Sequence, residues 1–311
     1  MNMTTTADDE DRVPVTVLGL GPMGAALASA FLENGYPTTV WNRTASKAVA
    51  LVEKGAVSAA SVADAVRASQ LVIVSVLDYA AARAIIEPVA ADLQGKMLVN
   101  VTTDSPDRAR EMAGWASGHG VEYLDGSIMT PTPTIGRPEA VFLYSGPEAV
   151  YEKSRPVLAS LGGTATYVGA DPGRAAAFDF ALLDVFWTGM AGVVHAFALA
   201  RTEGITAAEL LPFGRGIIDL LGEVTAEVAN DADRDHYPGD ESTLVSNVTG
   251  MAHIITAAQD RGVDVSVLRS AVGVANGAIA AGHGEDNFGR LVEVLARSAA
   301  RQGQDRPRTA A

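Results

Sequence analysis

The spacing of hydrophobic residues changes near residue 170. Between residues 13 and 168, short runs of β-branched and other apolar residues alternate with alanine-rich segments of helical periodicity. This alternation is typical of a parallel β-sheet covered by helices. After Asp171 the short runs stop, and long segments of helical periodicity follow. The sequence therefore predicts an α/β domain followed by an all-helical domain.

The helical half contains one unusually long segment. Residues 173–201 include no helix breaker except internal glycines, which predicts one helix of about 28 residues, about 42 Å long. Apolar residues surround it on nearly every side, which favours contact with a second subunit and hence a homodimer. Helix breaks are predicted at Gly204, at residues 212–216 and at residues 230–240. Strands are predicted in the first half at residues 14–18, 37–41, 71–76, 97–101, 122–125, 140–145 and 165–168.

A glycine-rich turn follows the first predicted strand and opens a predicted helix. Its residues are Gly19, Leu20, Gly21, Pro22, Met23 and Gly24. In this context Gly19 permits the tight turn, Gly21 lets the backbone approach a pyrophosphate, and Gly24 lets the helix and strand pack closely. The helix N-terminus attracts the negative charge. The arrangement predicts a Rossmann dinucleotide-binding domain and disfavours a chance glycine turn.

The end of the second predicted strand bears on the choice of cofactor. Asn42 stands where an NAD-binding protein usually has an acidic residue for the ribose hydroxyls. The residues that follow include Arg43, Thr44 and Lys47, whose groups suit a 2′-phosphate. This pattern predicts NADPH in preference to NADH. The alternative is that Arg43 and Lys47 are ordinary solvated charges at a helix start.

Small polar and apolar residues follow the third and fourth predicted strands, at the sheet edge where such a cofactor crosses. Ser105 is assigned as the cap of the helix that begins at Pro106. Thr103 is predicted to contact the substrate. The other residues are predicted to contact the cofactor: Ser75, Val76, Leu77, Asn100 and Thr102.

Composition excludes several classes of function. The 311 residues, 48% of them hydrophobic, are enough for two domains with separate cores. A net charge of -14 argues against a nucleic-acid partner. The absence of cysteine excludes disulfides and thiolate chemistry, and the histidines have no metal-ligand spacing, so no metal is expected.

The sequence also bears on the location of the protein. The N-terminus lacks signal-peptide features. The longest apolar run, residues 185–200, is too short to span a bilayer and contains His195. We therefore expect a cytoplasmic protein that does not enter a membrane.

These observations predict five parts along the chain. They are a frayed N-terminus (1–12), the Rossmann domain (13–170), a long interdomain helix (171–201), a helical C-terminal domain for dimerisation and substrate binding (202–300), and a tail (301–311).

Six segments carry a resemblance to a known family: VTVLGLGPMG, TTVWNRTASKA, VNVTTDSP, EYLDGSIMTPTPTIG, GADPGRAAAFDFALLDVFW and HYPGDESTLVSN. The span from Val13 to about Ala299 resembles the imine reductases, a branch of the β-hydroxyacid dehydrogenase superfamily. The resemblance implies hydride transfer from NADPH to the C=N bond of cyclic imines, giving chiral amines. It also implies a domain-swapped dimer with shared active sites, and leaves open whether a ketone and an amine are substrates.

The long predicted helix carries the candidate catalytic residue. The superfamily's dehydrogenases have a lysine on this helix, but the matching position is Ala177, Ala181 stands near the usual asparagine, and no lysine follows Lys153. Asp184 lies seven residues after Ala177, within 20° of the same helix face. The resemblance implies that Asp184 donates a proton to the imine or stabilises the iminium, in the manner of the group called R-selective. Asp179, about 140° away, is interpreted as structural.

A mainly apolar substrate pocket is expected around this acid. The candidates are Met129, Thr130, Trp187 and Thr188, together with Phe213, Ile217, Tyr237, Ser246 and Asn247 from the partner subunit. Core packing is the alternative for each aromatic residue. Two other functions stay open: an NADPH-dependent reductase of hydroxyacids or carbonyls, and a non-catalytic NADPH-binding protein.

Overall fold

The computed structural model describes residues 12–296. The predicted tail at 301–311, and all but the last residue of the predicted frayed N-terminus, lie outside the described residues. The chain divides between Asp184 and Val185 into two compact units. The domain boundaries predicted at residues 170 and 201 remain predictions.

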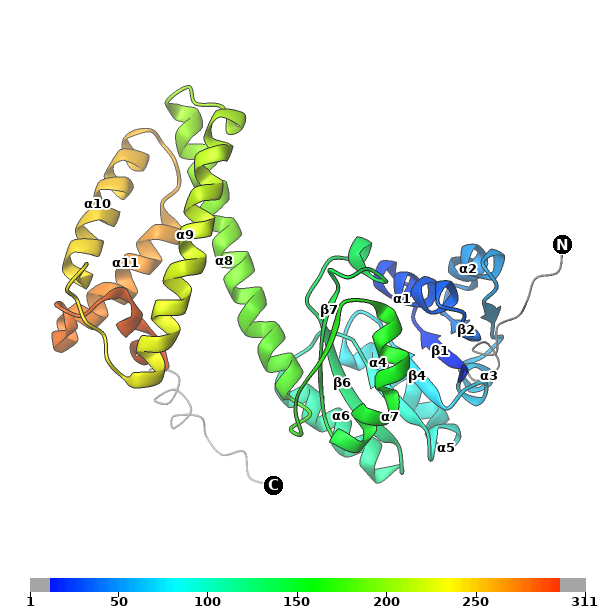
Figure 1. Cartoon of the computed structure of the whole chain (residues 1–311). Helices are drawn as coiled ribbons and strands as arrows, with labels where there is room; N and C mark the ends of the chain where they lie inside the picture. Colours follow the sequence, from blue (N-terminus) through cyan, green and yellow to red (C-terminus); the bar gives the residue numbers. More distant parts are fainter. Residues whose placement is uncertain (1–11, 297–311) are drawn as a thin grey trace. The chain divides into compact units, whose positions relative to one another are not determined.

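An eight-stranded sheet forms the centre of the N-terminal unit (Figure 1). Its order is β3-β2-β1-β4-β5-β6-β7-β8, and every pair is parallel except β6 and β7. The predicted parallel sheet covered by helices is confirmed, with one antiparallel pair at β7 that the sequence analysis did not predict. All seven predicted strands are present, and β3 is an addition, since its two exposed residues give no apolar run. The strands are β1 (Val15–Leu18), β2 (Thr38–Trp41), β3 (Val57–Ser58), β4 (Leu71–Val74), β5 (Met97–Asn100), β6 (Glu122–Ile128), β7 (Val141–Ser145) and β8 (Thr164–Gly169).

Helices cover both faces of this sheet and give each face its own apolar layer. One layer joins α1 and α7 to the sheet, and the other joins α3, α4, α5 and α6. The strand order reverses between β1 and β4, and a dinucleotide binds at the carboxyl ends of the strands at such a point. The helices are α1 (Pro22–Glu33), α2 (Val49–Glu53), α3 (Val62–Arg67), α4 (Tyr79–Ile86), α5 (Ala90–Leu93), α6 (Pro106–Gly118) and α7 (Glu148–Leu158).

The long helix is confirmed as a single element, α8 (Arg174–Thr202), of 29 residues. The break at Gly204 is also confirmed, because α9 (Ala207–Arg234) begins just after it. The break predicted at residues 212–216 is wrong: α9 continues through Pro212, six residues into the helix, and a capping box of Thr206 and Glu209 stabilises its start. The predicted loop at 230–240 begins later, at Asp235. Two further helices follow, α10 (Leu244–Asp260) and α11 (Ser266–Ala278).

The C-terminal unit exposes much apolar surface. Among residues 185–296, its buried apolar cluster consists of Leu244, Ala275, Ala278 and Leu291. Large apolar side chains on α8 and α9 are exposed, among them Phe186, Val194, Phe213, Ile217 and Leu221. Surfaces of this kind mark sites of association.

By length and composition, α8 is able to cross a membrane. An 18-residue window within Arg174–Thr202 has a mean hydropathy of 1.5. The expectation of no membrane segment, which rested on the charge-free run 185–200, stays a prediction. Long helices that cover another subunit pass the same test of length and hydropathy.

Candidate active site

The glycine turn after β1 has the geometry of a pyrophosphate site. Gly19 has φ +97°, and a Cβ there would lie 2.2 Å from the Ser75 carbonyl oxygen. A Cβ on Gly24 would lie 2.0 Å from the Gly19 carbonyl oxygen, whereas a Cβ on Gly21 would meet no heavy atom within 4 Å. The first turn of α1 has no side-chain cap and no acidic residue. Gly19 and Gly24 are thus required for close packing of the backbone. Gly21 instead leaves open space, where the backbone and the helix N-terminus suit a phosphate.

Alanine at Gly21 and at Gly24 should therefore have different effects. Gly24→Ala is expected to lower the melting temperature of the protein without cofactor, because the new methyl group overlaps backbone. Gly21→Ala should keep the wild-type melting temperature and weaken NADPH binding about tenfold or more, because the methyl group fills the phosphate space. Thermal unfolding and fluorescence titration with NADPH test both variants. Unchanged NADPH affinity in Gly21→Ala would contradict the assignment.

Asn42 connects the glycine turn to the loop after β2, and both segments are predicted to contact the cofactor. Its side-chain oxygen accepts a hydrogen bond from the Leu20 amide at 2.9 Å, and its side-chain nitrogen donates to the Thr44 carbonyl at 3.0 Å. These hydrogen bonds use one acceptor site of the side-chain oxygen and one of the two N–H groups of the side-chain nitrogen, so this amide supports the site. Arg43, Thr44 and Lys47 are exposed on the same loop. They are accessible to a 2′-phosphate.

The carboxyl ends of β4 and β5 bring the other predicted cofactor residues together. Ser75, Asn100 and Thr102 are buried. The Thr102 hydroxyl accepts a hydrogen bond from the Val76 amide at 3.2 Å, and the Asn100 side-chain oxygen accepts one from the Thr102 amide at 3.2 Å. Leu77 is 88% exposed. Ser105 caps α6 as predicted.

The start of α8 is held against the N-terminal unit. The Ser145 hydroxyl donates to the Pro172 carbonyl and accepts from the Ala175 amide, each at 2.9 Å. Arg110 forms two hydrogen bonds to the Asp171 carboxylate, at 2.7 and 3.0 Å. A Cβ on Gly173 would lie 2.7 Å from the Pro106 carbonyl oxygen, so the helix approaches α6 closely. These contacts fix which side of α8 faces the sheet.

Asp179 lies on that buried side. It is 2% exposed and hydrogen-bonded to Thr103, and its Oδ2 has no hydrogen-bond partner among the described residues. Burial raises the pKa of the Asp179 carboxyl above its ordinary value, and the Thr103 hydrogen bond opposes this. Asp184 is exposed in the single chain. The two aspartates face different sides, as predicted, but the one interpreted as structural reaches the predicted substrate residue Thr103.

A second buried carboxyl accompanies Asp179. Asp125 is 1% exposed and pairs with Asn100 between β5 and β6. It accepts hydrogen bonds from the hydroxyls of Tyr79 and Tyr123, the second at 2.8 Å. Burial, aided by the charge of Asp179, raises the pKa of Asp125 to about 7, although the tyrosine hydrogen bonds favour its ionised form. Sequence analysis did not identify this cluster.

The other predicted pocket residues occupy varied surroundings. Met129 and Thr130 follow β6, and the Thr130 hydroxyl accepts a hydrogen bond from the Val141 amide at 3.2 Å. Tyr237 is buried in the C-terminal unit, with the Arg290 guanidinium carbon 4.2 Å from the centre of its ring. This agrees with the alternative that the aromatic residue packs in the core. Ser246 takes part in the capping box of α10. The remaining candidates belong to the C-terminal unit: Trp187, Thr188, Phe213 and Ile217 are exposed, and Asn247 is half-buried.

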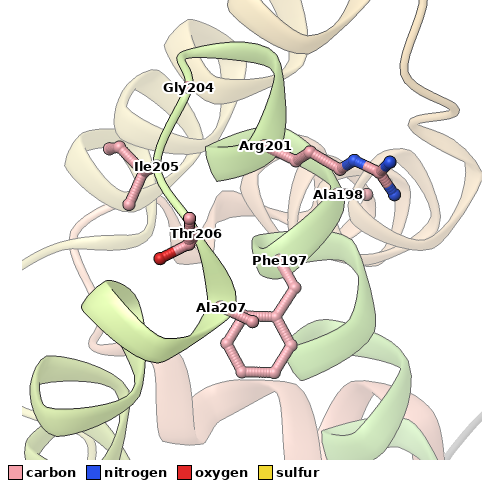
Figure 2. Close-up of a pocket in the computed structure, with 7 residues that line it drawn as sticks. All are labelled: Phe197, Ala198, Arg201, Gly204, Ile205, Thr206 and Ala207. Atoms are coloured by element: carbon pink, nitrogen blue, oxygen red, sulfur yellow. The ribbon is translucent and has the colours of Figure 1, made fainter.

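A hollow of about 520 Å³ lies at the turn between α8 and α9. Figure 2 shows seven residues that line it. None of the predicted site residues lines it, and Arg201 is the charged residue among its lining. It therefore offers no acid for proton transfer. Within residues 12–296, no three histidine, aspartate or glutamate side chains are grouped as metal ligands.

The fold and the glycine turn define a dinucleotide-dependent oxidoreductase with a helical second domain. Residues 14–169 match the NAD binding domain of 6-phosphogluconate dehydrogenase, and residues 171–297 match the NADPH-dependent reductive aminase-like C-terminal domain. The chain belongs to the family of NADPH-dependent imine reductases and reductive aminases, which confirms the resemblance.

Individual relatives agree with this assignment. An NADPH-dependent reductive aminase of Aspergillus oryzae is 33% identical over 90% of this chain and 96% of its own length. An imine reductase of Myxococcus stipitatus, solved with NADP+, is 38% identical with a TM-score of 0.87, covering 91% of this chain and 99% of that one. A reductive aminase of Aspergillus terreus, solved with NADPH4, cyclohexanone and allyl amine, is 35% identical with a TM-score of 0.86 and the same coverage.

Proposed function

We propose that this protein reduces the C=N bond of cyclic imines and iminium ions to chiral amines, and that it also accepts a ketone with an amine. The observation that carries the proposal is a buried aspartate, Asp179, on a helix without lysine. It is hydrogen-bonded to Thr103 in the segment that follows β5. The ketone and amine bound to the Aspergillus terreus enzyme support the second substrate class.

The proposed chemistry divides between cofactor and protein. Bound NADPH supplies the hydride. The protein must place positive charge on the imine nitrogen, because an iminium ion is a far better hydride acceptor than a neutral imine. A carboxyl with a raised pKa keeps its proton to higher pH than an ordinary aspartate and can donate it. We therefore propose Asp179 as the proton donor and keep Asp184, the acid implied by the sequence, as the second candidate.

A homodimer with shared active sites is part of this proposal. The exposed apolar side chains of α8 and α9 support it, since association would bury them. A partner subunit would also surround Asp184, which is exposed in the single chain. Analytical ultracentrifugation in detergent-free buffer should show a dimer, and a monodisperse monomer would contradict the proposal. We also propose R-selectivity and a cytoplasmic location, and both proposals rest on the sequence.

Substrate comparison tests the proposed activity. NADPH oxidation should be rapid with a pyrroline and slow with glyoxylate or succinic semialdehyde. Turnover of the carbonyl acids alone would favour the hydroxyacid or carbonyl reductase alternative. NADPH binding without turnover of any substrate would favour the non-catalytic alternative. Chiral analysis of the amine product gives the stereochemistry in the same experiment.

A further inference from the structure

We propose that Asp104 is a positioning residue that ties the segment after β5 to the start of α4 and so holds Thr103 at Asp179. This role rests on the proposed function, in which Asp179 donates the proton. Asp104 is half-buried in the segment between β5 and α6, directly after Thr103. It takes no part in the reaction itself and acts through Thr103.

Each carboxylate oxygen of Asp104 accepts a hydrogen bond from the start of a different helix. Oδ2 accepts from the amide of Tyr79, the first residue of α4, at 3.2 Å. Oδ1 accepts from the amide of Ser105, the N-cap residue of α6, at 2.7 Å. Both helix N-termini favour a negative charge. One side chain therefore joins two helices that pack in the same apolar layer against the sheet.

Asp104 and Thr102 fix the backbone on both sides of Thr103. The Thr102 hydroxyl accepts a hydrogen bond from the amide of Val76, in the segment that connects β4 to α4. Thr103, which is exposed, thus lies between two residues that are both tied to the connection from β4 to α4. Loss of the Asp104 carboxylate would release one of the two ties and give the Thr103 backbone more freedom.

Thr103 is the point where this tied segment meets the proposed acid. Asp179 is 2% exposed and is hydrogen-bonded to Thr103. Its Oδ2 has no hydrogen-bond partner among the described residues, so the Thr103 hydrogen bond sets the orientation of the carboxyl. Proton transfer requires the acid within hydrogen-bond distance of the imine nitrogen. A fixed Thr103 therefore keeps the acid in a productive orientation.

A double-mutant cycle separates positioning from general stability. Asp104→Ala and Thr103→Ala should each lower kcat for a pyrroline about tenfold, because the acid loses its alignment. The double variant should also lose about tenfold, and not the roughly 100-fold of two independent effects, since Asp104 acts through Thr103. Losses that multiply would overturn the inference, and so would a wild-type kcat in Asp104→Ala. NADPH affinity should change little in all three variants.

Asp78→Ala is the matched control on the same helix. The Asp78 carboxylate caps α4 by accepting a hydrogen bond from the Ala81 amide at 2.7 Å, and within residues 12–296 it forms no hydrogen bond to the segment after β5. Loss of this cap should lower the melting temperature and leave kcat close to that of the wild type. A loss in kcat equal to that of Asp104→Ala would show that any weakened start of α4 has this effect, and would overturn the inference.

Asp104→Asn keeps the test available if Asp104→Ala does not fold. Asparagine has one side-chain oxygen, so it can accept one of the two hydrogen bonds and not both. Its kcat should lie between those of the wild type and Asp104→Ala, and it should show the same dependence on Thr103. A loss that is unchanged in the Thr103→Ala background would contradict the proposed role.

Amide hydrogen exchange tests the tie without using activity. In Asp104→Ala, the amides of residues 100–103 should exchange faster than in the wild type, whereas Asp78→Ala should leave them unchanged. Asp104 accepts from the amides of Tyr79 and Ser105, so faster exchange at 100–103 reports a loosened segment and not the lost hydrogen bonds themselves. Unchanged exchange in Asp104→Ala would overturn the inference. Faster exchange in a protein that reduces no imine would reject the proposed function and keep the tie.

Discussion

Asp179→Asn is expected to lower kcat for a pyrroline by about 100- to 1,000-fold, the range typical of losing a general acid. Asparagine has nearly the same shape and keeps an oxygen for the Thr103 hydrogen bond, but it has no acidic proton to donate. Stability and NADPH affinity should change little. Steady-state kinetics, with thermal unfolding and cofactor titration on the same preparations, test this expectation.

Asp184→Asn is the matched variant on the same helix. Its loss in kcat should be smaller, about tenfold, because Asp179 would still supply the proton. A larger loss at Asp184 than at Asp179 would restore the acid implied by the sequence and reject the one that the structure favours. Asp179→Asn should also regain most of its activity with an N-methylated cyclic iminium salt, which already carries the positive charge and requires no proton. Equal losses on both substrates would show that Asp179 acts through its charge and not as an acid.

The parts of the fold that follow from local chemistry were predictable from the sequence. The glycine turn needs Gly19 at positive φ and Gly24 against the Gly19 carbonyl. Glycine meets both requirements, so the residue types themselves indicate the turn. The single helix α8 follows from a long segment without proline. Pro212 misled the prediction because one proline removes one hydrogen bond, which the capped and otherwise regular helix α9 tolerates.

The burial of Asp125 and Asp179 was not predictable, because it depends on packing between elements distant in sequence. Tyr79, Asp125 and Asp179 come from a helix, a strand and a second helix, and no periodic pattern connects them. One local signal existed: Ala175, Ala176 and Asp179 share a side of α8, and two small residues on one face indicate close packing. Helical phase separated Asp179 from Asp184 correctly, but it could not show which of the two sides meets the sheet.

Replacing both Arg43 and Lys47 by alanine is expected to raise KM for NADPH about 100-fold and to leave KM for NADH within about threefold. Each charge-assisted hydrogen bond to a 2′-phosphate contributes about 1.5–3 kcal/mol, and NADH has no phosphate there. Asn42 carries no charge, so it cannot replace the two cations beside the phosphate.

A control variant separates this local effect from a change in overall charge. Arg83 lies on α4 and forms an ion pair with Glu87, so Arg83→Ala removes a positive charge of the same unit without touching the loop. It should leave the preference for NADPH unchanged. The wild-type preference should also weaken as salt rises, because ions screen the exposed loop charges. If the double variant lost affinity for both cofactors equally, Arg43 and Lys47 would be ordinary surface charges, and another group would have to select the 2′-phosphate.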